Sequence, residues 1–146
     1  MPTAAKLIAS VLFAGLAYLL AGMFRQYLPP ATQLGWFGPI CTLIGLLCGW
    51  KIMGANAGQG MVIALNNGLR TAVSMVFLAL VLFSLEEMYQ VAIRKMYDGP
   101  LDAVLGAVNI GSGFALMLLQ PDFLAVLILG GVFCGWLTER VARRWP

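Results

Sequence analysis

The chain has 146 residues, of which 61% are hydrophobic and only 10% are charged. Soluble domains carry about 25% charged residues, so this chain has too few polar groups to cover a surface in water, whereas a lipid bilayer removes that need. The nine Lys and Arg residues give a net charge of +3, but they are scattered at the ends of apolar runs and do not form the basic patch that nucleic acid requires. We therefore expect an all-α, polytopic membrane protein: one domain over residues 1–146, with membrane lipid as a partner and no nucleic acid.

Apolar runs predict the helices. The first run, residues 7–24, would form a helix about 27 Å long, enough to cross the hydrocarbon core. It is longer than the usual signal-peptide core of about 7–15 residues, and no small-x-small cleavage site follows it, so we interpret it as a transmembrane helix. The expected helices cover about residues 7–24, 36–53, 61–97 with its end outside the bilayer, 101–119 and 122–143.

The number of membrane crossings stays open between four and five, with five favoured. Gln120, Pro121 and Asp122 separate the last two runs, which would form a tight antiparallel hairpin if both span the membrane. Asp102 and Asn109 weaken the first of these runs, which could instead lie at the interface or re-enter. The positive-inside rule does not decide, because either topology puts six basic residues inside and three outside, with the C-terminus cytoplasmic in both.

Residues that usually carry chemistry are sparse. The chain has no histidine, and its three cysteines, Cys41, Cys48 and Cys134, all lie inside apolar runs, where small packing residues are common. Cys41 and Cys48 would be about 10.5 Å apart along a helix, which is too far for a disulfide. No His, Cys or carboxylate group has chelating spacing. We expect no metal, no cofactor and no catalytic residue, and so a protein that is not an enzyme.

The one glycine-rich segment, residues 54–60, reads Gly-Ala-Asn-Ala-Gly-Gln-Gly. Glycine loops bind phosphate where they follow a strand, open a helix and carry a Lys-Ser/Thr pair. This segment follows a predicted membrane helix and lacks that pair. We interpret it as a flexible helix connector.

Charged residues gather around the junction of the third and fourth runs and form a candidate interfacial polar cluster. Charges inside a membrane usually mark function, because burying one costs at least about 2.5–3.5 kcal/mol, but all of these can reach an interface. Asp102 lies close to Pro100 at a predicted helix start, which favours interaction with the helix dipole over a proton or ion site. The cluster comprises Glu86, Glu87, Arg94, Lys95, Asp98 and Asp102.

Small residues recur at helical spacing and form two GxxxG motifs. Such stripes let helix backbones approach closely in lipid. Packing within the chain is the favoured interpretation, and a face for a partner protein is the alternative. The candidate packing or partner face comprises Gly38, Gly45, Gly49, Gly131 and Gly135.

Further motifs are spaced along nearly the whole chain: MPTAAKL at 1–7, GWF at 35–37, GWKIMG at 49–54, AGQG at 57–60, NNGL at 66–69, EEM at 86–88, YDGP at 97–100, GG at 130–131 and ARRW at 142–145. In these motifs the chain resembles the TrgA family of alphaproteobacterial membrane proteins, which is associated with tellurite resistance. The resemblance implies a multi-pass protein of the bacterial inner (cytoplasmic) membrane with no established catalytic residues. Family members carry more carboxylates before Gln120 than this chain does, so the resemblance assigns no role to that helix.

Three functions follow as hypotheses. The first is a non-enzymatic TrgA-type protein with an indirect effect on tellurite tolerance, since the thiols are separate and no cationic cavity is evident. The second is an accessory subunit packed against a larger respiratory or photosynthetic membrane complex. The third is a small transporter, which would need polar groups converging at the midplane and usually repeated halves; the sequence has no internal repeat.

Overall fold

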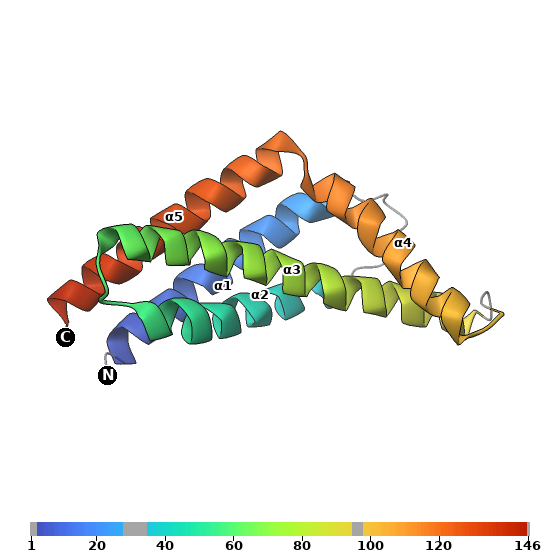
Figure 1. The fold of residues 1–146 in the computed structure, drawn as a ribbon, viewed down its shortest axis with the longest axis horizontal. Coiled ribbons are helices and arrows are strands. Elements are labelled where there is room, and N and C mark those ends of the chain that lie inside the picture. Colours follow the sequence, from blue (N-terminus) through green and yellow to red (C-terminus); the bar gives the residue numbers. More distant parts are fainter. Residues whose placement is uncertain (1–2, 28–34, 95–97, 146) are drawn as a thin grey trace.

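The computed structural model describes residues 3–27, 35–94 and 98–145, and within these ranges every regular element is a helix (Figure 1). Five stretches are long and apolar enough to cross a membrane, which confirms the all-α, polytopic fold class. The helices are α1 (Thr3–Tyr27), α2 (Phe37–Cys48), α3 (Met61–Ile93), α4 (Pro100–Leu118) and α5 (Pro121–Arg144). The second stretch extends α2 through a π-helical turn (Gly49–Met53) and a 3₁₀ turn (Gly54–Asn56).

Local chemistry explains where several helices begin. Pro100 and Pro121 occupy the first turns of α4 and α5, where the missing N–H would have no partner in the helix. Gly60 precedes α3 with φ +123°, a conformation that side chains with a Cβ rarely adopt. The 3₁₀ turn after α2 is closed by Asn56, whose side-chain amide donates to the carbonyl oxygen of Ile52 at 2.8 Å.

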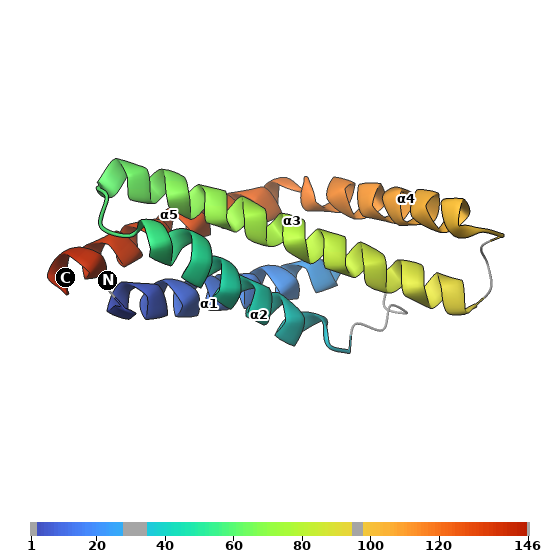
Figure 2. The ribbon, with the colours of Figure 1, turned by 60° about the horizontal axis from the view of Figure 1, so that its bottom comes forward.

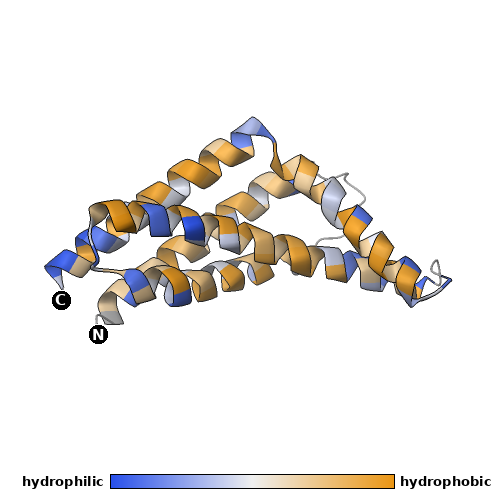
Figure 3. Ribbon diagram, viewed as in Figure 1, coloured by the Kyte–Doolittle hydropathy of each residue, from blue (hydrophilic) through white to orange (hydrophobic). Residues whose placement is uncertain are grey.

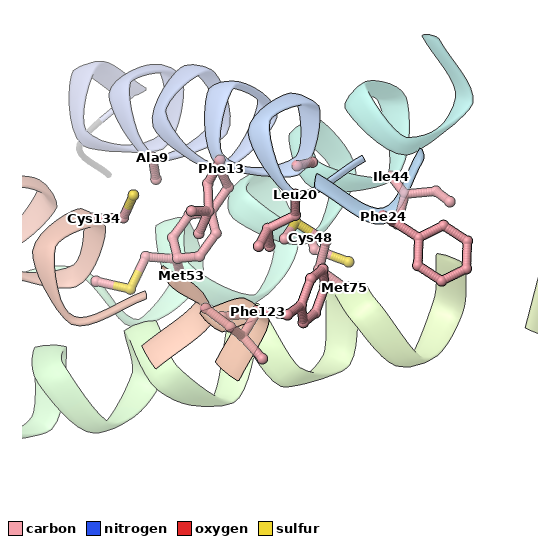
Figure 4. Close-up of a cluster of buried hydrophobic side chains, with 14 of the residues drawn as sticks. Ala9, Phe13, Leu20, Phe24, Ile44, Cys48, Met53, Met75, Phe123 and Cys134 are labelled. Atoms are coloured by element: carbon pink, nitrogen blue, oxygen red, sulfur yellow. The ribbon is translucent and has the colours of Figure 1, made fainter. Parts of the chain in front are cut away.

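The core lies between α1 and the helices around it. α1 packs against α2, α5 and the π-helical turn, and α3 closes the bundle against α5 (Figure 2). Phe13 and Met53 are completely buried, and Figure 4 shows them beside Ala9 and Cys134. All three cysteines are free and buried in this apolar interior.

Four phenylalanines form a cluster where α1, α2, α3 and α4 meet. Phe24, Phe37, Phe83 and Phe114 come from α1, α2, α3 and α4, with neighbouring ring centroids 4.6–5.9 Å apart and most pairs edge to face. Each such aromatic pair adds about 0.5–1.5 kcal/mol to the free energy of simple burial. The cluster joins the first three helices to the end of α4.

The tight hairpin that was expected if both of the last two helices span the membrane is not present, because α4 and α5 lie one after the other along α3. α5 packs on the first half of α3, where Gly131 lies against Ala72, and α4 packs on the second half, where Gly111 lies against Ser84. α3 can hold both partners because its 33 residues span about 50 Å, against about 30 Å for a hydrocarbon core. Figures 1 and 2 show α4 and α5 diverging from the corner at Pro121.

This arrangement brings both ends of the chain to one end of the molecule (Figures 1 and 2). The first turns of α1 lie against the connector between α2 and α3, where a Cβ at Gly54 would be 2.8 Å from Cγ of Lys6. The last turns of α5 contact the same connector through Glu139. All five helices are long and apolar enough to cross a membrane. The common position of the two termini favours an even number of crossings, in which α1, α2 and α3 each cross once and α4 and α5 together make one return.

We accordingly predict that the two termini lie on the same side of the membrane. Reporter proteins joined to the N-terminus and to the C-terminus should both be active on one side, and a reporter joined after Asp98 on the other. Termini that report opposite sides would show five complete crossings and contradict the arrangement of α4 and α5.

Candidate functional site

The first GxxxG motif packs α2 onto α1. Gly45 and Gly49 are both buried. A Cβ added at Gly45 would lie 2.5 Å from the carbonyl oxygen of Phe13, and one at Gly49 would lie 2.7 Å from that of Ala9. Cβ atoms are essentially never so close to a backbone oxygen, so only glycine permits this helix separation. At Gly38, near the start of α2, an added Cβ would meet only the ring of Tyr18, at 3.9 Å.

The second GxxxG motif packs α5 onto α3 in the same way. A Cβ at Gly135 would lie 2.6 Å from the carbonyl oxygen of Ala64, and one at Gly131 would lie 3.0 Å from Cβ of Ala72. Gly68 of α3 faces both, and a Cβ there would collide with the carbonyl oxygen of Gly131. The four glycines of the two motifs are thus covered by helices of the same chain, and a partner protein has no access to them.

Glu139, near the end of α5, is the polar feature that the sequence interpretation missed. Its side chain is 1% exposed, and among the described residues it is the only buried charged group. The Oε2 atom accepts a hydrogen bond from the backbone N–H of Gly58 at 2.8 Å, and Oε1 accepts one from Gly60 at 3.1 Å. Arg143, one helical turn further on, donates from Nε to Oε1 at 3.2 Å.

The glycine-rich connector is shaped to hold this carboxylate. Gly58 has φ +90° and Gly60 has φ +123°, and these left-handed conformations let both N–H groups turn towards one anion. The connector is therefore an anion-binding loop whose anion is a side chain of the same chain. The sequence alone predicts only a flexible connector, whereas the structure shows that two N–H groups of this segment bond to Glu139.

The chemistry of Glu139 follows from these bonds. A buried carboxylate is costly unless charges and hydrogen bonds compensate it, and here both oxygens have donors. With both oxygens hydrogen-bonded, Glu139 ties the end of α5 to the connector between α2 and α3. Two signals in the sequence pointed to it: the four-residue spacing to Arg143, and its position as the only acid in residues 123–146.

The candidate interfacial polar cluster lies at the far end of α3 and the start of α4, away from Glu139 (Figure 3). Glu86, Arg94, Asp98 and Asp102 are exposed and Glu87 is half-buried, whereas Lys95 falls outside the described residues. No ion pair joins the described members of this cluster. Asp102 lies in the first turn of α4 and makes no capping hydrogen bond, so its interaction is with the helix dipole.

An apolar cavity of about 40 Å³ lies between α1, α2 and α3 beside the α4–α5 corner. Its walls include Phe24, Cys41, Met75, Phe83, Leu118 and Phe123. Such a space holds a few waters at most, and apolar walls give them no hydrogen bonds. In the described part of the chain, no three His, Cys, Asp or Glu residues converge as metal ligands.

Comparison with protein-family models, curated proteins and solved structures gives no significant match for this chain. The resemblance to the TrgA family therefore rests on the spaced motifs in the sequence.

We predict that Glu139→Ala lowers the free energy of unfolding by about 3 kcal/mol, the lower end of the range for breaking a buried ion pair, because Arg143 can turn to solvent. Glu139→Gln should lower the free energy of unfolding by less, about 1.5 kcal/mol, because one oxygen acceptor remains. Reversible unfolding in detergent micelles measures both values.

The matched control is Glu86→Gln, which removes an exposed carboxylate without an ion partner and should change stability by less than about 0.5 kcal/mol. Amide hydrogen exchange at Gly58 and Gly60 should accelerate in Glu139→Ala and should not change in Glu86→Gln. Equal stability of Glu139→Ala and the native chain would contradict the proposed tie.

Proposed function

We propose that the chain is a non-enzymatic, multi-pass membrane protein of TrgA type with an indirect effect on tellurite tolerance. The observation that supports a non-catalytic role is the state of Glu139: the buried carboxylate has both oxygens bonded within the fold. The cavity between the helices is small and apolar, which suits packing better than the binding of an oxyanion.

The thiols support an indirect effect. Direct reduction of tellurite would require electrons from an accessible thiol pair or a redox cofactor. Cys41 and Cys48 lie on α2 and Cys134 on α5, and all three are buried among apolar side chains. Buried thiols of this kind behave as small hydrophobic groups.

We predict that deleting the gene sensitises cells to tellurite and that a chain carrying Cys41→Ala, Cys48→Ala and Cys134→Ala restores growth as well as the native chain does. Growth inhibition by tellurite, with immunoblots of the membrane fraction to match protein levels, measures the outcome. A deletion without effect would remove the tellurite link, whereas failure of the cysteine-free chain at native levels would point to direct thiol chemistry.

We further propose the cytoplasmic membrane as the location, with both termini in the cytoplasm. Basic residues gather at the end of the molecule that carries the termini: Lys6 is in the first turns of α1, Lys51 is in the π-helical turn, and Arg140, Arg143 and Arg144 are in the last turns of α5. The opposite end carries the four acidic residues of the interfacial polar cluster, and of the described basic residues it carries Arg25 and Arg94. Basic residues favour the cytoplasmic side, so this asymmetry supports the orientation.

A second function, an accessory subunit of a larger membrane complex, is favoured by the surface of α4. None of its residues is buried, and it exposes Leu101, Val104, Leu105 and Val108. Beyond Phe83, α3 continues for ten residues, about 15 Å, with α4 beside it. The apolar face of α4 beside the last ten residues of α3 would suit a neighbouring membrane subunit as well as lipid.

For that second function we predict that the chain purified in a mild detergent migrates with a larger complex, and that Val104→Asn with Val108→Asn releases it. Mass spectrometry of the purified particle identifies the components. Matched changes at two exposed residues of α1 with the same spacing, Leu7→Asn with Val11→Asn, are the control and should leave the complex intact. A particle containing this chain alone would contradict the proposal.

A further inference from the structure

The outward face of α5 carries a ladder of two aromatic rings and a guanidinium. Phe133 and Trp136 stack with ring centroids 6.2 Å apart and planes at 30°. The Cζ atom of Arg140 lies 5.0 Å from the centroid of the Trp136 ring. Because these residues are three and four positions apart, they follow one side of the helix. Phe133 is 56% exposed, so the ladder faces the surroundings.

An apolar groove leads to this ladder. It is lined by Leu65 of α3 and by Leu129, Gly130, Val132, Phe133 and Trp136 of α5. From Leu129 to Arg140 the helix rises about 16.5 Å, which is close to half of the roughly 30 Å hydrocarbon core. The groove and ladder therefore match the depth that one acyl chain fills in a single leaflet.

Among the described residues of α5, the exposed charged side chains at the end of the groove are all positive. Arg140 and Arg144 are exposed, and Arg143 keeps 58% of its side chain exposed while it bonds Glu139. Glu139 points inward, so its carboxylate does not face this surface. The stacking of Arg140 on Trp136 holds the guanidinium where the apolar groove ends, so less conformational entropy is lost on binding.

We propose that this face of α5 is a binding site for one anionic phospholipid. The acyl chain lies along Leu129, Phe133 and Trp136, and the phosphate receives hydrogen bonds from Arg140 and Arg144. Guanidinium groups suit phosphate because their planar N–H fork can bond two oxygens at once. A zwitterionic lipid would bring its own ammonium group towards these cations, so net negative charge decides the preference. The site is independent of any link to tellurite.

Trp136 reports directly on this site. We design a chain in which the exposed Trp36, Trp50 and Trp145 are replaced by phenylalanine, so that Trp136 is the only tryptophan. It is placed in vesicles of phosphatidylcholine and phosphatidylglycerol in which one lipid or the other carries brominated acyl chains. Bromine quenches indole fluorescence at contact, so the two quenching curves give the relative affinity of the groove for each lipid.

Brominated phosphatidylglycerol should quench Trp136 at lower mole fraction than brominated phosphatidylcholine. Arg140→Gln should reduce this preference about fivefold, the effect of one basic residue at a charged membrane surface. The matched control, Lys51→Gln, removes one exposed charge from the same end of the molecule but from another element, and should leave the preference unchanged.

Two results would overturn the proposal. Equal quenching by the two brominated lipids would show ordinary exchange of surrounding lipid without a site. An equal loss of preference in Lys51→Gln and Arg140→Gln would show a general effect of surface charge. Circular dichroism of each variant establishes that the helices are retained.

Discussion

The close approach of helix backbones at four glycines is the constraint on which this structure depends. In lipid, apolar side chains gain nothing from leaving the solvent, so helices associate through van der Waals contact and hydrogen bonds. Gly45 and Gly49 bring α2 onto the backbone of α1, and Gly131 and Gly135 bring α5 onto the backbone of α3. The two glycine pairs therefore set the distance between α1 and α2 and between α3 and α5. A larger residue at Gly45, Gly49 or Gly135 would place its Cβ against a backbone oxygen of the neighbouring helix and separate the pair, whereas at Gly131 the contact is with the methyl group of Ala72.

A second interaction closes the end of the molecule where the chain begins and ends. The two glycine N–H groups of the connector hold the carboxylate of Glu139, and Arg143 completes its neutralisation. Because Glu139 turns inward, the opposite side of α5 is left with an apolar groove, an aromatic ladder and exposed guanidinium groups. The same helix therefore serves the fold on one side and presents a positively charged, lipid-facing surface on the other.

The other end is organised by the length of α3. Its 33 residues form a helix longer than a hydrocarbon core is thick. Two helices can therefore pack on it, α5 on its first half and α4 on its second half. The phenylalanine cluster joins the end of α4 to the bundle. The polar residues of the interfacial cluster stay exposed around this extension and form no ion pairs among the described members. At this end of the molecule, the apolar surface that is left uncovered is therefore that of α4.

The sequence by itself determined the membrane class and the helical content, because these follow from hydropathy, proline and glycine positions within short segments. The third helix was expected to reach residue 97, but α3 ends at Ile93. The sequence also indicated Gly45, Gly49, Gly131 and Gly135 as packing residues, although not which helices they would meet. Only the tertiary structure decided that α4 packs on the second half of α3 and does not pair with α5. As a result, both termini lie at one end of the molecule. The tertiary structure alone revealed the bond between Glu139 and the connector about eighty residues earlier. The reason is physical: hydropathy and backbone preference act between neighbours in the chain, whereas the partner of a buried charge is set by how whole helices pack.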